Sequence, residues 1–263
     1  MATPAGRLSL GATTREPMLG TEITLTRGAD GRVEARDARG RLRTVAEVND
    51  MVLVWEGAGD PTYEVATFAE LGDPAWTDFR WARSRRYATP VQNVQRDVVD
   101  NDHFAPVHHL DRAETRASFD GCFVDTTSHG IMNLARIGGP PLRCHIRLDG
   151  RLHGVGILTY RTTITIGIQI HGLLVTAPTP VDADHVRFHV GALTRRWKIP
   201  GIATLVRRGV VASVIADTAR DAMHWESPSG RFEAASPDPD GPALAARFDR
   251  WMEQFSGSPA GVT

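Results

Sequence analysis

One short stretch of the sequence concentrates the residue types that bind transition metals. The stretch DVVDNDHFAPVHH, residues 97–109, contains three aspartates and three histidines. Within it, Asp100, His103 and His108 form the pattern D-x2-H-x4-H. Imidazole and carboxylate groups together are common ligands of iron and zinc sites. The composition and spacing make this stretch a candidate metal-binding segment.

The geometry of the two histidines depends on the proline between them. On an unbroken helix, residues five positions apart point about 140° away from each other, which is poor geometry for sharing an ion. Pro106 cannot donate a backbone hydrogen bond and disturbs the turn before it. We therefore expect an interrupted helix that lets both imidazoles reach one ion. Two partly exposed loop histidines remain the alternative on composition alone.

Alternation of apolar and polar residues predicts that strands position this segment. Residues 21–40 alternate around a Gly-Ala-Asp-Gly turn, as in a hairpin, and residues 43–57 predict a second strand pair. Residues 57–76 are rich in Gly, Pro and Asp and are expected to connect these strands to another over 77–89. From 117 to 195 the pattern is mostly that of strands with one buried and one wetter face.

Helical periodicity follows the strands, over residues 209–226 and again over 243–255. Strands in runs, with helices grouped before and after them, predict an α+β fold with a mainly antiparallel sheet. Residues 1–18 lack periodicity and are expected to form a flexible tail.

Charge and hydropathy narrow the classes of function. The formal net charge of −1 does not favour nucleic acid or an anionic membrane surface as a partner. We find no apolar run long enough to span a bilayer and no export signal at the start of the chain. Cys122 and Cys144 form no disulfide framework and are expected to stay reduced, so we predict a cytoplasmic protein.

Four segments together resemble the Rieske non-haem iron oxygenases, most closely the ketosteroid-hydroxylase type of terminal oxygenase. QRDVVDNDHFAPVHHLDRAETRASFDG, residues 95–121, resembles the iron-binding segment of that family. The other three follow in the family's order and are HGLLVTAPTPVDADHVRFHV, TARDAMHWESP and RFDRWMEQF, at residues 171–190, 218–228 and 247–255. The resemblance covers residues 75 to 256 and implies an antiparallel-sheet, helix-grip (START-like) catalytic domain.

The resemblance also implies a set of iron ligands. His103 and His108 correspond to the two histidine ligands and Asp221 to the carboxylate ligand, which together make the facial triad for one Fe(II). His109 is an alternative to His108, but the x4 spacing favours His108. Asp100 corresponds to the acid that, in the family, links an iron ligand to the neighbouring subunit's cluster. Asp97 stands where the family usually has asparagine, and these two acids are the candidate catalytic residues.

The cysteines depart from the family. A Rieske [2Fe–2S] cluster needs a C-x-H and a C-x-x-H pair, and neither Cys122 nor Cys144 begins such a pattern. GADGRVEARDA (28–38) and GRLRTVAEVNDMVLVWEG (40–57) resemble the strands that flank the cluster loops. We therefore expect no [2Fe–2S] cluster, a vestigial Rieske-like β domain over 19–74, and a catalytic domain over 75–263.

The expected loss of the cluster shapes the functional hypotheses. The first is a repurposed enzyme that cyclises or rearranges a hydrophobic polycyclic or polyketide-like intermediate of natural-product (antibiotic) biosynthesis without oxidation. The second is an Fe(II) oxygenase with an external electron source, and the third is a non-catalytic binder of a hydrophobic ligand. Because the cluster loops contribute to the family's trimer interface, we expect a monomer or dimer rather than an obligatory trimer.

Overall fold

The structure is a computed structural model that describes residues 1–55, 60–137, 140–197, 202–230 and 241–255. Its centre is a seven-stranded sheet in the order β8-β14-β13-β12-β11-β10-β9, with every neighbouring pair antiparallel. The strands are β8 (Arg80–Tyr87), β9 (Leu110–Asp120), β10 (Phe123–Asn133), β11 (Arg143–His153), β12 (Ile157–Thr165), β13 (Gln169–Pro180) and β14 (Val186–Thr194). The expected α+β fold with a mainly antiparallel sheet is confirmed.

The connection from β8 to β9 determines where the histidine stretch lies. Strands β9 to β14 form a meander, whereas β8 pairs with β14 at the opposite edge from β9. The chain between β8 and β9 must therefore cross from one edge of the sheet to the other. This crossover carries α1 (Val91–Arg96), the 3₁₀ turn η2 (Asp97–Val99) and α2 (Phe104–His108). It places residues 97–109 over the sheet.

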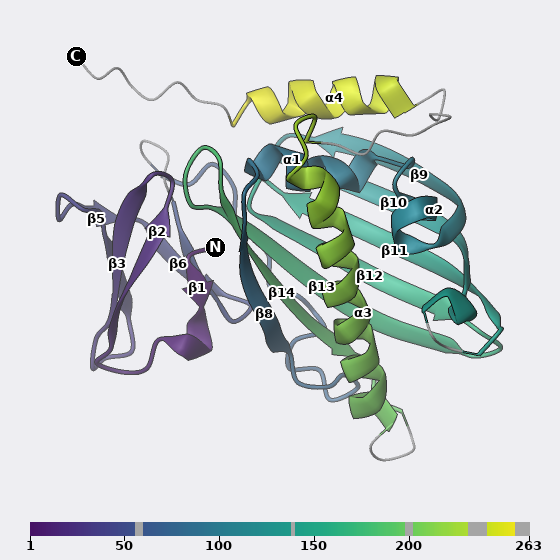
Figure 1. The fold of residues 1–263 in the computed structure, drawn as a ribbon. Coiled ribbons are helices and arrows are strands. Elements are labelled where there is room, and N and C mark those ends of the chain that lie inside the picture. Colours follow the sequence, from purple (N-terminus) through teal and green to yellow (C-terminus); the bar gives the residue numbers. More distant parts are fainter. Residues whose placement is uncertain (56–59, 138–139, 198–201, 231–240, 256–263) are drawn as a thin grey trace.

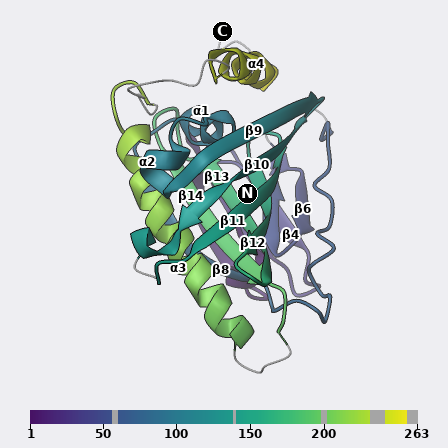
Figure 2. The same cartoon turned by 90° about the vertical axis from the view of Figure 1, so that its right-hand side faces the viewer.

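Two longer helices complete the large unit. Helix α3 (Ile202–Trp225) follows β14 and runs across the sheet on the side of the crossover, as Figures 1 and 2 show. Helix α4 (Gly241–Glu253) packs against the crossover at the sheet's end, and the indole of Trp251 donates a hydrogen bond of 2.8 Å to the Gly121 carbonyl. A short turn, η3 (Leu134–Ile137), follows β10.

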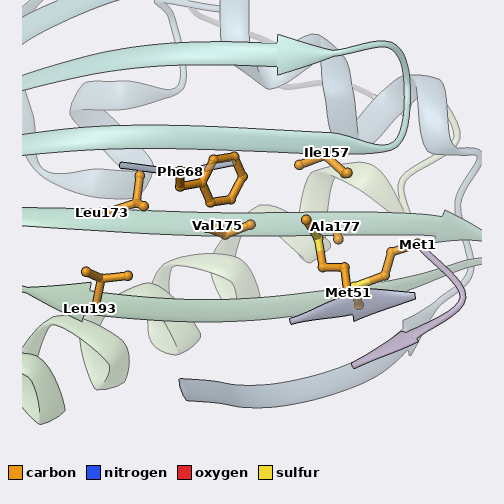
Figure 3. Close-up of a cluster of buried hydrophobic side chains, with 8 residues drawn as sticks. All are labelled: Met1, Met51, Phe68, Ile157, Leu173, Val175, Ala177 and Leu193. Carbon is orange, nitrogen blue, oxygen red and sulfur yellow. The ribbon is translucent and has the colours of Figure 1, made fainter. Parts of the chain in front are cut away.

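Apolar side chains bury both faces of the central sheet. On the crossover side, Val186, Phe188 and Val190 pack against α1 and against Trp225 of α3. Figure 3 shows the other cluster, which lines β12 to β14 and the segments packed on them and consists of Met1, Met51, Phe68, Ile157, Leu173, Val175, Ala177 and Leu193. The helices and the amino-terminal strands therefore lie on opposite faces of the sheet (Figure 2).

Two small antiparallel sheets precede the large one. One has the order β1-β7-β6 and the other β2-β3-β4-β5. Their strands are β1 (Thr3–Pro4), β2 (Thr13–Met18), β3 (Thr21–Arg27), β4 (Val33–Arg36), β5 (Leu42–Arg43), β6 (Val45–Val48) and β7 (Met51–Val54). Hairpins β3–β4 and β6–β7 form where the alternation indicates them. The domain boundary near residue 74 stays a prediction.

The expectation of a flexible tail over residues 1–18 is wrong. Strand β2 pairs along its whole length with β3, β1 pairs with β7, and the short turn η1 (Ala5–Arg7) lies between them. Ala2, Leu8 and Met18 are buried in the small sheets' core with Ile23 and Leu25. Strand β2 (TTREPM) has a single fully buried residue, Met18, and is ordered by pairing with β3 rather than by a buried face of its own.

Of the helices that the structure describes, none combines the length and the apolar character needed to cross a bilayer. Cys122 is partly buried, Cys144 is fully buried, and both are free thiols.

The buried His153 predicts a pH-dependent loss of stability. Burial, together with Arg151 and Arg161, lowers the pKa of His153 from 6.5 to about 4. Between pH 6.5 and pH 4, His153 is protonated in the unfolded chain but stays neutral in the folded chain. Stability therefore falls as the pH drops from 6.5 towards 4. We expect this site to contribute about 2–3 kcal/mol to that loss.

The contribution of His153 to the pH dependence can be measured by replacing its imidazole with a ring that does not titrate. Urea unfolding at pH 7 and at pH 4.5 should show a smaller loss of stability for His153→Phe than for the wild type, because a phenyl ring takes up no proton. Phenylalanine suits the site, since the rings of Phe68 and Phe123 lie beside His153. His129→Phe, at an exposed histidine on β10, is the control and should keep the wild-type pH dependence. Equal losses in the wild type and His153→Phe would contradict the assignment.

Candidate metal centre

The crossover supplies the two histidines through a short, interrupted helical path. The turn η2 ends at Val99, and α2 begins at Phe104 with His103 as its N-cap residue. The interruption thus lies before His103 and not at Pro106, which occupies the first turn of α2. A proline is tolerated there because the backbone N–H has no helical partner in any case. Helix α2 ends at His109, whose backbone is left-handed with φ of 57°.

This path brings the two imidazoles together with a carboxylate from α3. The His103 and His108 rings have centroids 4.8 Å apart and stand nearly perpendicular. Asp221 Oδ1 lies 3.1 Å from His108 Nε2. One ligand atom from each of His103, His108 and Asp221 lies within 4.8 Å of the other two. The three residues that the family resemblance selects therefore converge, although Asp221 is more than 100 positions away in the sequence.

Asp97, Asp100 and His109 are not members of the triad. The Asp97 carboxylate accepts a 2.5 Å hydrogen bond from the Trp225 indole. Asp100 accepts a 2.9 Å hydrogen bond from the backbone N–H of Asp102, and its other oxygen is 3.9 Å from His103 Nδ1. Among the described residues, His109 belongs to no cluster with metal-ligand spacing. The geometry agrees with the choice of His108 over His109.

Two further residues of α3 face the centre, and the sequence motifs did not predict either as a site residue. Asp217 Oδ1 is 3.7 Å from His108 Nδ1, and His224 Nε2 is 3.3 Å from both carboxylate oxygens of Asp97. Residues 217, 221 and 224 are spaced i, i+4, i+7, which puts them on one side of a helix. Helical periodicity applied to polar residues would have identified them from the sequence.

The surroundings of the two histidines shift their pKa values in opposite directions. For His103, burial dominates and lowers the pKa to about 4, so its imidazole is neutral at pH 7 and able to bind a metal. For His108, burial also lowers the pKa, but the carboxylates of Asp217 and Asp221 outweigh it and raise the pKa to about 10. A metal ion bound through Nε2 would therefore displace a proton from His108.

Two more groups near the centre have shifted pKa values. Burial and the charge of Asp97 raise the pKa of Asp100 to about 6. Burial, followed by the charges of Asp97 and Asp221, raises the pKa of the Tyr160 phenol above its usual range. Tyr160 is thus a neutral hydroxyl at pH 7. The centre combines several carboxylates with a neutral imidazole and a phenol that keeps its proton.

The donor set suits one divalent metal ion. His103 Nδ1 and Asp221 Oδ1 are buried and have no hydrogen-bond partner, since Asp221 Oδ1 and His108 Nε2 are close but poorly aligned. A buried polar atom without a partner destabilises a fold by about 1–3 kcal/mol. Two imidazoles and one carboxylate would meet a divalent ion as the facial triad does and leave other positions open. The residues present fit an Fe(II) ion.

Comparison with known proteins places this geometry in a family. The profile of the 3-ketosteroid 9alpha-hydroxylase C-terminal domain matches residues 55–256, which is most of the chain and includes the whole metal centre. The chain belongs to this family. The predicted Rieske-oxygenase catalytic domain of ketosteroid-hydroxylase type is thereby confirmed.

Two curated relatives from Rhodococcus rhodochrous support the assignment. The oxygenase component of a 3-ketosteroid-9-alpha-monooxygenase is 23% identical over 230 residues, covering 83% of this chain and 58% of the relative. A probable oxygenase component of the same kind is 24% identical over 234 residues, covering 83% and 57%. The chain thus spans less than two thirds of each relative. Both relatives are oxygenases by name, and neither supports the cyclase hypothesis.

Solved structures share the fold at low sequence identity. Dicamba monooxygenase bound to dicamba has a TM-score of 0.67 and 15% identity, with 97% of this chain and 96% of that chain covered. NdmA of Pseudomonas putida CBB5 has a TM-score of 0.67 and 9% identity, covering 96% and 85%. The similarity therefore extends to the small amino-terminal sheets as well as to the family's C-terminal domain.

Proposed function

We propose that this protein is a mononuclear non-haem iron enzyme that oxidises a hydrophobic polycyclic molecule. The observation that carries the proposal is the convergence of His103, His108 and Asp221 from two distant segments, two of which carry a buried polar atom without a hydrogen-bond partner. Fe(II) bound by such a triad supplies coordination positions for oxygen or substrate. The names of the curated relatives support an oxygenase over the ring-closing reaction.

The chain's own residues would hold and shield the ion. His103 binds as a neutral imidazole, and Asp217 lies on the Nδ1 side of His108, where it orients the ring. Trp225 holds the Asp97 carboxylate beside the centre. The buried Tyr160 phenol is a hydrogen-bond donor that does not ionise at neutral pH. These groups would position the ion and present a hydrogen-bond donor within the site.

Electron supply separates this protein from a complete Rieske oxygenase. The 263 residues contain no C-x-H or C-x-x-H pair, so they carry no ligand set for a [2Fe–2S] cluster. The proposed oxygenase therefore takes reducing equivalents from a separate protein or from its own substrate.

The same sequence feature favours a second candidate function. An enzyme that receives no electrons can still fold a flexible apolar substrate into a reactive conformer, and holding reacting groups together can lower a barrier by several kcal/mol. Cyclisation or rearrangement of a polyketide-like intermediate is such a reaction, and a bound metal could assist it as a Lewis acid. Non-catalytic binding of a hydrophobic ligand is the remaining alternative.

A His103→Ala, His108→Ala double variant tests these functions. The iron-loaded wild type, given a chemical reductant and a 3-ketosteroid as probe, should bind one iron at the triad and consume oxygen when the steroid is added. The double variant should lose both properties, because two of three ligands are gone. The control is His129→Ala, His145→Ala, which removes two exposed imidazoles from β10 and β11 and should behave as the wild type.

Other outcomes point to the alternatives. Oxygen consumption in the double variant equal to that of the wild type would contradict iron-dependent oxidation at this site. Conversion of polyketide-like substrates to isomers without oxygen uptake would support cyclisation, and survival of that conversion in the double variant would make it metal-independent. Tight binding of apolar ligands without any turnover would support the binder.

A further inference from the structure

An arginine near the start of α3 points inward and lacks an acidic partner. The solvent-exposed side of α3 is formed by Arg208, Ala212, Ala216, Ala219 and Met223. Arg207 points about 140° away from the middle of that side. Its Nε atom is buried and has no hydrogen-bond partner among the described residues. A buried guanidinium N–H without an acceptor is unfavourable, so an anion bound at Arg207 would stabilise it.

Helical spacing puts Arg207 on the same side of α3 as the carboxylate of the triad. Arg207 and Asp221 are fourteen positions apart (221 − 207), which is close to four full turns. At a rise of 1.5 Å per residue, they lie about 21 Å apart along the helix axis. Val211 and Val214 lie between them on this side and are only partly buried. The inward side of α3 therefore leads from the metal centre, past apolar side chains, to an unpaired cation.

The sheet face that carries the crossover also has apolar side chains that are only partly buried. Leu152 of β11 packs against η2 and so identifies this face. Because side chains alternate along a strand, Ile146 and Leu148 share the face with Leu152, and Ile164 shares it through its pairing with Ile146. All three isoleucine and leucine side chains of this second group are partly exposed. Ile164 lies toward the end of the sheet at which β14 stops and the chain continues to α3.

The chain around Arg207 carries an excess of positive charge. Residues 185–216 contain six lysines and arginines and no aspartate or glutamate. Two of these arginines form ion pairs with acids outside the range, namely Arg187 with Glu16 and Arg196 with Asp78. Within the part of the chain that the structure describes, Arg207 has no such pair. The local field therefore favours an anionic group at this end of α3.

We propose that Arg207 binds a carboxylate of the substrate, so that the protein acts on an extended polycyclic acid. The inference rests on the proposed function and adds the substrate class to it. The apolar body of the substrate would lie between α3 and the sheet, with one end at the metal centre and its carboxylate at the start of α3. An arginine can bind a carboxylate through two parallel N–H···O bonds, which fix its position and its orientation. Arg207 would thus determine specificity without touching the metal.

A matched pair of probes tests this site in the full-length protein. The probes are a 3-ketosteroid whose side chain ends in a carboxylic acid and the methyl ester of the same molecule, each titrated by calorimetry at neutral pH. The wild type should bind the acid about 10-fold more tightly than the ester, because only the acid accepts charge-assisted hydrogen bonds. Added salt should weaken the binding of the acid more than that of the ester.

Arg207→Gln should bind the acid about 10-fold less tightly than the wild type does and should bind the ester equally well. Glutamine has nearly the helix propensity of arginine, so the change removes the cation without weakening α3. Arg208→Gln is the control, since it removes the neighbouring arginine on the exposed side, and it should keep the preference for the acid.

Three results would overturn the carboxylate site: equal affinities for acid and ester in the wild type, a preference that survives in Arg207→Gln, or an equal loss of both ligands in that variant. The last result would assign Arg207 a structural role. Iron binding and oxygen uptake are measured on the same wild-type protein. If they hold without a preference for the acid, the proposed function stands and the carboxylate site fails. If the preference holds but no iron binds, the site stands as a binding site and the proposed oxidation fails.

Discussion

Replacing Asp221 by alanine should reduce iron binding by roughly 100-fold or more, a larger loss than the 10–100-fold typical of residues that only support a metal ligand. Asp221 supplies the carboxylate of the triad, and its Oδ1 lies 3.1 Å from His108 Nε2. Without it, two imidazoles remain, and the positive charge of the ion is no longer balanced by a direct ligand. Calorimetric titration with Fe(II) under argon, with iron analysis after desalting, measures the change.

Asp102→Ala is the comparison for this prediction. Asp102 is in the same acid-rich stretch, and its backbone N–H donates to Asp100, an interaction that the substitution retains. Its iron affinity should stay within a few-fold of the wild type. Equal losses from Asp221→Ala and Asp102→Ala would show that the third ligand is wrongly assigned. Circular dichroism of both variants checks that their total helix and strand content matches that of the wild type.

Replacing Phe248 by alanine should lower the free energy of unfolding by about 3–5 kcal/mol, the range for a large aromatic removed from a core. Phe248 is 1% exposed and lies in the cluster that joins α4 to η2, β10 and β11. Its neighbours Val98 and Val99 directly follow Asp97, so the cavity would form under the metal centre. Urea unfolding followed by circular dichroism measures the loss.

Arg250→Ala provides a matched change on the exposed side of the same helix. Alanine favours helix in both variants, so the difference between them reports the buried contact and not helix propensity. Arg250→Ala should change the unfolding free energy by about 0.5 kcal/mol or less. A loss below about 1 kcal/mol in Phe248→Ala would show that α4 contributes little to the core, against the range for buried aromatics.

The sequence predicted the large sheet well because strong periodicity and burial coincide there. The strands between residues 117 and 195, the helix over 209–226 and the helix over 243–255 all form where the pattern indicates. The amino-terminal segment was mispredicted because β2 has few apolar residues and depends on pairing with β3. Local pattern does not reveal an ordered strand whose stability comes from a partner strand.

Only part of the candidate site could be predicted from the sequence. Family resemblance selected His103, His108 and Asp221, and the structure brings them together. Residue pattern alone left the histidines as either a loop pair or a metal site, and it placed the helix break at Pro106. His224 and Asp217 face the centre because α3 lies across the crossover. That contact is tertiary, so only the i, i+4, i+7 spacing of acids and histidine on α3 hinted at it.

The path from β8 across the sheet to β9 has a consequence for the order in which the protein assembles. His103 and His108 are synthesised with this crossover, whereas Asp221 emerges only after the whole meander and most of α3. The triad is therefore complete only after Asp221 has been synthesised and α3 has docked over the crossover. Closing a loop of more than 100 residues carries a large entropic penalty. A bound ion would therefore stabilise the folded chain only at a late step, after the crossover and α3 have come together.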